Sequence, residues 1–332
     1  MVLVTGATGF VGGNVARRLA DDNWKVRALV RTTTSLPVVS LEHPNITCVV
    51  GDIIQPTTLM TACANVAVIF HAAADTRLRR WQQAWQTNVT GTQMVYEAGR
   101  NAGIHRFIFT STFDVYLGLA RYQDEDTPLL PYGDVYGDSK IAAETFLRSQ
   151  PPPPEVVILR LPPVYGPGSR EWTVNPLRDA QAHRLFLPDG GRAPFPYLYI
   201  ENLADAVAAV VAAPQAHGVY NVLDGRTTYT SFFNFFARLS GNSVRSIPYW
   251  LLYSLAFGAD VYTRLTRRWT ALSRRRVRAV FGGQRSGWPG ADCFQRDFGW
   301  MPRVDLVEGQ RRSETWLRQN GFLAAHNRSA AD

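Results

Sequence analysis

The sequence is poor in cysteine and in lysine. Its three cysteines, Cys48, Cys63 and Cys293, lie far apart and form no CxxC pattern. This spacing supports neither a disulfide framework nor a zinc site, so we expect no metal and a reducing compartment. Among the 35 basic residues only Lys25 and Lys140 are lysines, and the other 33 are arginines. The position of each lysine is therefore informative.

A signal peptide and a membrane-spanning run are missing as well. The first chemical motif begins at Thr5, which leaves no room for a signal peptide, so we expect a cytoplasmic protein. The most apolar stretch, IPYWLLYSLAFGADVY at 247–262, is shorter than the roughly 20 residues that a spanning helix needs. Seven arginines follow it between Arg264 and Arg278.

The stretch 247–278 has three interpretations. In the first, a buried helix precedes a solvated basic helix. In the second, an apolar and basic patch makes peripheral contact with an anionic membrane surface. The third is an acidic partner such as a carrier protein or a nucleic acid; of these two we do not expect nucleic acid.

Short apolar, β-branched runs alternate with amphipathic stretches through the first half of the chain. Continuous apolar strands separated by helices are typical of a parallel sheet that is covered by helices on both faces. The sequence therefore predicts an α/β fold with a doubly wound parallel, or Rossmann, sheet. Its strands are expected within 1–6, 24–31, 46–52, 66–74, 105–112 and 154–161.

The second half of the chain is less regular and rich in aromatic residues, as in SFFNFFARLSG at 231–241. We expect residues 1–165 to form the dinucleotide-binding domain, with returns of the chain to its sheet near 196–225. Residues 166–195 and 226–325 are expected to form a smaller, interleaved C-terminal lobe that binds the substrate.

A glycine-rich turn, VTGATGFVGG at 4–13, joins the first predicted strand to the first helix. Gly6, Gly9 and Gly12 allow a tight turn and a close approach of the backbone to a pyrophosphate. The N-terminus of the helix adds free N–H groups and a partial positive charge. A tight turn without a ligand is the alternative, but the strand–turn–helix context favours a dinucleotide site.

Two residues after the next strands concern nucleotide preference. A dinucleotide fold that prefers NAD places an acidic residue after its second strand, where this chain has Arg31. A guanidinium cannot accept a hydrogen bond from a ribose hydroxyl, but it can hold a 2′-phosphate, so we expect NADP in preference to NAD. A surface arginine beside an NAD site is the alternative. Asp52 is expected to accept a hydrogen bond from the adenine amino group, or else to be a plain turn residue.

Tyr136 and Lys140 are four residues apart on a predicted helix and therefore share a face. A tyrosine with a pKa of about 10 exchanges protons poorly at neutral pH, and a nearby cation lowers that pKa. Lysine is a compact charge that can reach both a tyrosine and ribose hydroxyls, whereas arginine is a wide planar fork. We therefore expect Tyr136 to act as general acid or base and Lys140 to lower its pKa. An exposed helical pair is the alternative.

Several segments occur in the order and spacing of the extended short-chain dehydrogenase/reductases: TGATGFVG, GDI, HAAAD, NVTGT, FTST, YGDSK, LRLPPVYGPG and FGWMPRVDLVEG. The chain resembles this superfamily over most of its length. Within it, the chain is most similar to the 3β-hydroxysteroid dehydrogenase group, and it also resembles hopanoid-associated epimerase/dehydratase-like proteins. The resemblance implies an NAD(P)-dependent enzyme that acts on CH–OH groups and forms a homodimer through its central helices.

The resemblance places the family's catalytic hydroxyl on Thr112, 24 residues before Tyr136. Ser111 is the less favoured candidate, because adjacent strand residues point to opposite faces. Asn88 matches a family asparagine for which we expect a structural role, and His71 receives no catalytic role. The cofactor-binding residues that we expect are Gly6, Thr8, Gly9, Phe10, Val11, Gly12, Arg31, Asp52, Ile53, His71, Ala72, Ala73, Tyr136, Lys140 and Pro163.

The chain departs from the family pattern in two places. Leu161 stands where the first proline after the strand is usual, although Pro162 and Pro163 follow it. Sugar-nucleotide 4,6-dehydratases carry Asp-Glu after the catalytic threonine, whereas this chain carries Phe113 and Asp114. We therefore expect no such elimination, and we expect the bulky Phe113 to lie near the reacting centre.

The aromatic residues of the second half favour a lipophilic substrate, because the four phenylalanines at 232–236 exceed what one helix face can hold. Packing in the core is the alternative for many of them. We expect hydride transfer that interconverts a secondary alcohol and a ketone on a small sterol-like, terpenoid or acyl substrate. A nucleotide-sugar epimerase, a non-enzymatic NADP-binding protein and a membrane tether remain open. Arg170, Arg178 or Arg192 would bind the diphosphate in the epimerase.

Overall fold

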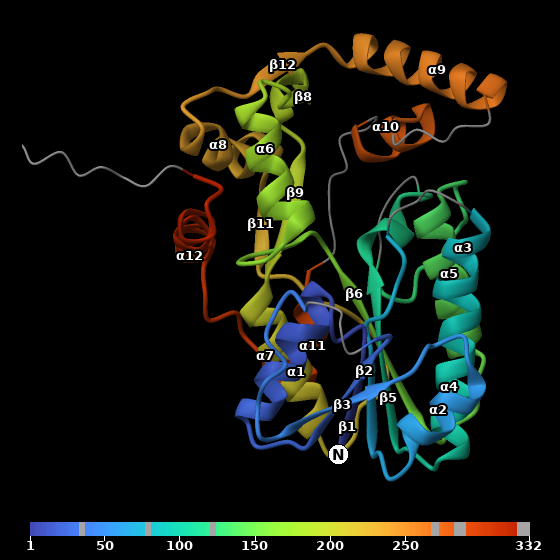
Figure 1. Ribbon diagram of the computed structural model, residues 1–332. Helices are drawn as coiled ribbons and strands as arrows, with labels where there is room; N and C mark the ends of the chain where they lie inside the picture. The colour runs from blue at the N-terminus through green and yellow to red at the C-terminus, as the bar shows by residue number, and fades with distance from the viewer. Residues whose placement is uncertain (33–36, 77–80, 120–123, 267–271, 282–289, 324–332) are drawn as a thin grey trace, which may run out of the picture.

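A parallel sheet of seven strands lies at the centre of the computed structural model (Figure 1). The structure describes residues 1–32, 37–76, 81–119, 124–266, 272–281 and 290–323. The strand order is β10-β6-β5-β4-β1-β2-β3, and every neighbouring pair is parallel. This arrangement confirms the predicted doubly wound fold. The strands are β1 (Val2–Thr5), β2 (Val26–Val30), β3 (Ile46–Val50), β4 (Val68–His71), β5 (Arg106–Thr112), β6 (Glu155–Leu161) and β10 (Gly218–Asn221).

Helices cover both faces of this sheet. Val2 and Val4 of β1 pack in the core that contains α1 and α7, and Leu3 between them packs in the core of the other face. All three side chains are completely buried, which is why the strands read as continuous apolar runs. The helices are α1 (Phe10–Asp21) and α7 (Ile200–Ala212) on one face, and α2 (Pro56–Cys63), α4 (Gly91–Asn101) and α5 (Val135–Arg148) on the other.

A second lobe lies beyond the carboxyl ends of the central strands (Figure 1). It contains a three-stranded sheet, β11-β9-β7, and a pair of short strands, β12 and β8. Its strands are β7 (Val164–Tyr165), β8 (Phe186–Pro188), β9 (Pro194–Tyr199), β11 (Gly225–Thr228) and β12 (Arg245–Ile247). Its helices are η3 (Arg170–Val174), α6 (Asn175–Gln181), η4 (Asp189–Gly191), α8 (Tyr229–Leu239), α9 (Tyr249–Thr266) and α10 (Arg274–Phe281).

The predicted returns of the chain to the central sheet are half right. β10 joins that sheet beside β6, but β9 pairs with β7 and β11 in the small sheet. The sheet to which β9 belongs was predicted wrongly. An apolar run indicates that a strand is buried, but it does not indicate which sheet the strand joins. The chain re-enters the larger domain through α7 instead, directly after β9.

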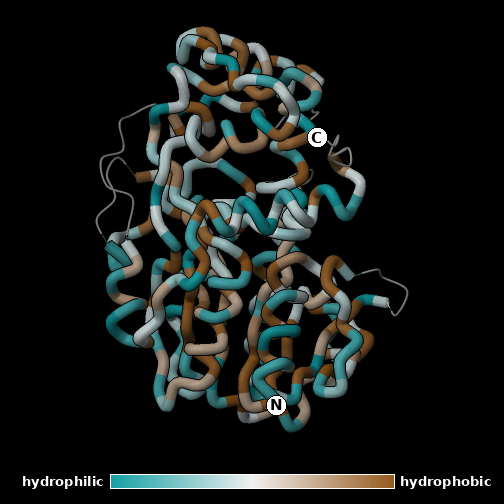
Figure 2. The backbone as a smooth tube through the Cα atoms, turned by 90° about the vertical axis from the view of Figure 1, so that its left-hand side faces the viewer, coloured by the Kyte–Doolittle hydropathy of each residue, from teal (hydrophilic) through white to brown (hydrophobic). Residues whose placement is uncertain are grey.

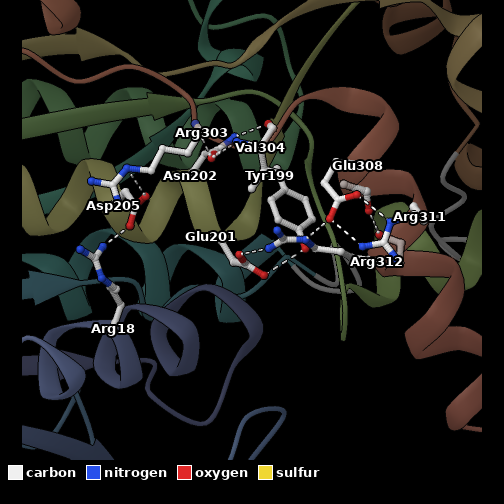
Figure 3. Close-up of polar contacts among 12 residues, drawn as sticks. Arg18, Tyr199, Glu201, Asn202, Asp205, Arg303, Val304, Glu308, Arg311 and Arg312 are labelled. Atoms are coloured by element: carbon white, nitrogen blue, oxygen red, sulfur yellow. Dashed lines mark hydrogen bonds and ion pairs between the residues drawn. The ribbon is translucent and has the colours of Figure 1, made fainter.

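Residues near 300 also return to the larger domain rather than staying in the second lobe. The amide side chain of Asn202 in α7 donates to the carbonyl oxygen of Val304 (2.8 Å) and accepts from the backbone N–H groups of Arg303 and Val304. Arg312 contacts both Glu201 and Glu308 (Figure 3). The segment thus holds α12 (Leu306–Gln319) against α7, and α11 (Asp292–Phe298) packs on β10.

The aromatic surplus of α8 is mostly core. Phe232, Phe235 and Phe236 are buried, and only Phe233 is half-exposed. Phe195 of β9 lies 4.4 Å from Phe232, ring centre to ring centre. These phenylalanines fill the interior of the second lobe, so they do not argue for a lipophilic ligand.

Helix α9 behaves differently. Trp250, Leu255 and Leu265 are 68, 53 and 80% exposed, which contradicts the interpretation of 247–262 as a buried helix. Among the helices that the structure describes, none is both long enough and apolar enough to cross a membrane.

Candidate active site

The glycine-rich turn brings three backbone segments into contact at the carboxyl end of β1. Gly6 has a φ of +70°, and a Cβ atom there would lie 2.7 Å from the backbone nitrogen of Ala73. A Cβ atom on Gly12 would lie 2.6 Å from the carbonyl carbon of Gly6. Only glycine fits either position. The turn therefore holds β1, α1 and the loop after β4 close enough for backbone to meet a pyrophosphate.

The N-terminus of α1 is free to receive an anion. Its N-cap is Gly9, no side chain caps the helix, and its first turn contains no acidic residue. The unpaired N–H groups and the helix dipole therefore face the turn without competition. Thr8, Phe10 and Val11 lie in the same segment, and the carbonyl oxygen of Thr8 accepts a hydrogen bond from the N–H of Val38 (3.1 Å). This cradle fits the cofactor that the sequence predicts.

His71 connects β1 to α4 through buried hydrogen bonds next to the glycine-rich turn. Thr92 donates its hydroxyl proton to the carbonyl oxygen of Asn88 (2.7 Å), so it accepts from Nε2 of His71 (3.0 Å). Nδ1 then accepts from the hydroxyl of Thr5 (2.7 Å), which in turn accepts from the N–H of Ala73 (3.3 Å). Burial, and secondarily Lys140, lowers the pKa of His71 to about 3. The ring is thus a neutral, fully buried connector, and only the backbone of this segment and the half-buried Ala72 and Ala73 can face a cofactor.

The residues expected around the nucleotide differ in exposure. Arg31 is exposed immediately after β2, and Asp52 follows β3 with Oδ1 accepting from the N–H of Ile54 (3.1 Å). The side chain of Ile53 is 8% exposed and contacts α4 at Gly91, so it belongs to the core. Pro163 is half-buried between β6 and β7, and its carbonyl oxygen accepts from the N–H of Leu198 (3.1 Å).

Lys140 lies inside the protein, one helical turn after Tyr136. Asp134 caps the N-terminus of helix α5, and its carboxylate accepts from the N–H groups of Tyr136 and Gly137. Lys140 is 1% exposed, and its ammonium donates to the carbonyl oxygen of Thr110 near the end of β5 (2.7 Å). Burial lowers the pKa of Lys140 to about 7. The two side chains share a face as predicted, with the Lys140 nitrogen 5.8 Å from the centre of the Tyr136 ring.

The expected lowering of the Tyr136 pKa is wrong for the protein alone. Burial raises this pKa above its usual value, and the carboxylates of Asp114, Glu171 and Asp134 raise it further. Lys140 does not offset them, because its own charge is weakened by burial and its nitrogen is bonded to Thr110. Tyr136 is therefore a neutral phenol at neutral pH.

The two hydroxyls at the end of β5 point in different directions. Ser111 is buried and donates to the carboxylate of Glu144. Thr112 is half-buried, and its oxygen accepts from the N–H of Asp114 (3.2 Å). The bulky Phe113 is buried against Tyr116 with a ring separation of 5.8 Å, so its side chain belongs to the core. The next residue, Asp114, carries a carboxylate that raises the pKa of Tyr136.

Comparison with known proteins bears on this geometry. Residues 2–222 match the model of the NAD dependent epimerase/dehydratase family. The chain belongs to this family. Its glycine-rich turn and its Tyr-Lys pair both lie inside the matched region, and the resemblance to extended short-chain dehydrogenase/reductases is confirmed.

Individual members of the epimerase/dehydratase family differ in how much they share. The 3-beta-hydroxysteroid dehydrogenase of Mycolicibacterium neoaurum is 36% identical over 161 residues, which are 45% of this chain and 43% of that enzyme. The match therefore spans less than half of that relative's length. The ceramide reductase of Caulobacter vibrioides is 28% identical over 97% of this chain and 96% of its own. The dTDP-glucose 4,6-dehydratase of Bacillus anthracis, solved in complex with NAD, has the same fold, with a TM-score of 0.73, 22% identity and 97% coverage of both chains.

Sequence reasoning missed a buried ion pair beneath the site of this family member. Arg160 of β6 is completely buried and donates to both carboxylate oxygens of Glu144 in α5 (2.7–3.2 Å). It also donates to the hydroxyl of Tyr116 (2.7 Å), which donates to Asn221 of β10 (2.8 Å). An arginine within the apolar run VVILRL was the signal that could have revealed it.

Asn88 has the structural role expected of it. It lies in the π-helical turn η1 (Gln86–Thr90), which follows α3 (Trp81–Trp85). Its amide nitrogen donates to the hydroxyl of Ser139 (3.0 Å), and its oxygen accepts from the N–H of Asp75 (2.7 Å). Asn88 thus joins the loop after β4 to α5 and helps to place Tyr136.

Proposed function

We propose that the protein is an NAD(P)-dependent oxidoreductase that interconverts a secondary alcohol and a ketone on a lipophilic substrate. The observation that carries the proposal is the buried Lys140 beside Tyr136. Among the described residues, Lys140 uses one of its three N–H groups, toward Thr110. The two others can donate to hydroxyl groups of the ribose that the glycine-rich cradle would bring to this edge of the sheet.

Each polar residue then has a separate task. The nicotinamide, when bound, supplies or accepts the hydride. Tyr136 exchanges a proton with the substrate oxygen, and its neutral form is the one that donates this proton in ketone reduction. Thr112 orients the same oxygen through its hydroxyl. Lys140 holds the ribose and stays in place because β5 fixes it through Thr110.

The names of two relatives and the positions of three arginines of the second lobe support the proposal of a lipophilic substrate. The names of two relatives refer to a steroid and to a ceramide. A nucleotide-sugar epimerase would need cations for a diphosphate, but the guanidinium of Arg178 stacks on Phe322, 5.5 Å from its ring centre. Arg170 and Arg192 are exposed.

The preference for NADP(H) is also part of the proposal. Arg31 stands at the end of β2 with its side chain exposed, where a 2′-phosphate would extend from the adenosine ribose. No acidic residue occupies this position to accept from a 2′-hydroxyl.

Substitution of Tyr136 tests the proposal. The wild-type protein is expected to oxidise NADPH with sterol or 3-keto-acyl ketones and to leave nucleotide sugars unchanged. Tyr136→Phe should lower kcat by about 10²–10⁴-fold, because the proton donor is lost. Cofactor affinity, measured by fluorescence titration, should stay within about threefold, because the phenol does not hold the phosphates.

A matched control is Tyr132→Phe, since Tyr132 is also a tyrosine, lies just before α5 and has no part in the proposed reaction. Full turnover by Tyr136→Phe, or turnover of nucleotide sugars alone, would contradict the proposal.

A further inference from the structure

Helix α9 exposes a largely apolar face. Figure 1 places α9 at the top of the molecule, and the tube at the top of Figure 2 contains brown, hydrophobic segments. The exposed large side chains on this helix are those of Trp250, Leu251, Leu255, Phe257, Val261, Tyr262 and Leu265. Single exposed apolar residues are ordinary on a protein surface, but seven on one helix form a patch.

These side chains lie on one side of the helix. At 100° per residue they span roughly 160° of its circumference, and the other exposed residues within that arc are Ser254 and Gly258. The opposite side faces the protein, where Ala256 is completely buried and Asp260 is half-buried. The helix therefore exposes its apolar side to solvent, whereas a surface helix of a globular protein normally packs its apolar side against the core.

Positive charge borders the apolar face. Between 249 and 278 the sequence has seven arginines and a single acidic residue, Asp260. The carboxylate of Asp260 is paired with Arg274 of α10 (2.9 Å), and the guanidinium of Arg274 lies 4.5 Å from the centre of the Phe257 ring. Arg278 of α10 is exposed. An apolar face beside unbalanced positive charge is complementary to anionic lipid rather than to a neutral apolar protein surface.

The same helices lie on the side of the molecule that carries the candidate active site. Figure 1 shows α9 and α10 beyond the carboxyl ends of the central strands. From α10, ring contacts run inward: Phe281 to Tyr229 (5.2 Å), Tyr229 to Phe195 (4.8 Å) and Phe195 to Trp172 (5.6 Å). Trp172 follows Glu171, one of the carboxylates that raise the pKa of Tyr136.

We propose that α9 lies in the interfacial plane of an anionic bilayer, with its apolar face in the lipid and Arg274 and Arg278 of α10 at the headgroups. The docked surface would place the entrance of the active site against the membrane. A lipophilic substrate would then pass between the bilayer and the active site without crossing bulk water. This last step rests on the proposed function, whereas the docking itself does not.

Vesicle flotation of the full chain tests the docking. We expect the protein to float with vesicles of phosphatidylcholine and phosphatidylglycerol in equal parts, and to stay behind with pure phosphatidylcholine. Trp250→Ser with Leu265→Ser should lower the binding constant about tenfold or more, because both side chains leave the lipid. Roughly 0.5 M NaCl should also weaken binding, because it screens the arginines.

The matched control is Met60→Ser with Val307→Ser, since these side chains are 72 and 75% exposed but lie on α2 and α12. This control should float like the wild type. Absence of flotation, equal flotation with pure phosphatidylcholine, or equal loss in the control would each overturn the proposal. So would a lipid-free dimer, measured by light scattering, that the variant at Trp250 and Leu265 converts to monomer, because a second copy would then cover the face.

Activity separates this proposal from the proposed function. The variant at Trp250 and Leu265 should keep wild-type turnover of a short-chain, water-soluble ketone and lose turnover of a ketone embedded in vesicles. Flotation without any ketone reduction would leave the docking in place and contradict the proposed enzyme. Equal turnover of embedded ketone by variant and wild type would overturn the entry route.

Discussion

Lys140 combines deep burial with a single hydrogen bond from its ammonium to Thr110 (2.7 Å). A guanidinium would need room for a planar fork, and the ring of Phe109, centred 4.5 Å from the nitrogen, closes one side of that space. The geometry thus explains why a chain with 33 arginines retains lysine here. Helical spacing was enough to predict this pair. It was not enough to predict the protonation of Tyr136, because Asp114 and Glu171 approach it from other elements.

Arg31 offers a test at the scale of one side chain. Arg31→Ala should raise the KM for NADPH about 10- to 100-fold, because a charge-assisted contact with the 2′-phosphate is lost. The KM for NADH should change little. Steady-state kinetics with both cofactors measure the two values, and Arg17→Ala on the outer side of α1 serves as control. Equal effects on NADPH and NADH would show that Arg31 does not distinguish them.

At the scale of elements, the ion pair between Glu144 and Arg160 fixes α5 to β6. Both side chains are buried, and Ser111 of β5 donates to the same carboxylate. Three elements are thus joined one turn after Lys140, which keeps the catalytic helix in register with the sheet. Neither the pairing nor its partners follow from sequence, because nothing in the pattern states which helix residue faces Arg160.

Removing one partner of this pair should be costly. Glu144→Gln leaves Arg160 buried without a counter-charge, and we expect the free energy of unfolding to fall by about 3–5 kcal/mol. Urea denaturation measures this change. The control is Glu314→Gln in α12, whose pair with Arg318 is partly exposed, and which should cost at most about 1 kcal/mol. Similar losses in both variants would show that the buried pair contributes no more to the free energy of unfolding than the partly exposed pair.

Other elements show where sequence patterns succeed and fail. The central strands were predictable because burial on both faces leaves continuous apolar runs, as in β1 and β4. Strand β9 was assigned to the wrong sheet, because its pairing with β7 depends on contacts between distant residues. The sequences of α8 and α9 are both rich in apolar residues. Only the structure shows that those of α8 are mostly buried and those of α9 mostly exposed.

For the whole molecule, Asp224 occupies the junction between the two lobes, between β10 of the central sheet and β11 of the small one. Its Oδ2 accepts from the N–H of Tyr199 (2.6 Å). Its other oxygen and the hydroxyl of Tyr165 are buried without partners among the described residues. Burial raises the pKa of Asp224 to about 7. The junction therefore contains a carboxyl group that the folded protein prefers to keep neutral.

This shift predicts how stability depends on pH. In the unfolded chain the carboxyl ionises near pH 4, whereas in the folded protein it ionises near pH 7. Its contribution to stability is therefore complete below about pH 4 and is lost as pH rises toward 7. Relative to wild type, Asp224→Asn should gain about 2–3 kcal/mol of unfolding free energy between pH 5 and pH 8, as measured by denaturation at each pH. A constant difference across this range would contradict the assignment.

The contacts of Asn202 with Arg303 and Val304 also have a consequence for synthesis on the ribosome. The face of the central sheet that α1 begins to cover is completed by α7 and by the segment that Asn202 secures, which are translated much later. A nascent chain ending at 165 would present that apolar face to water. We therefore expect the nucleotide-binding half to complete its core only after the polypeptide beyond residue 300 has emerged.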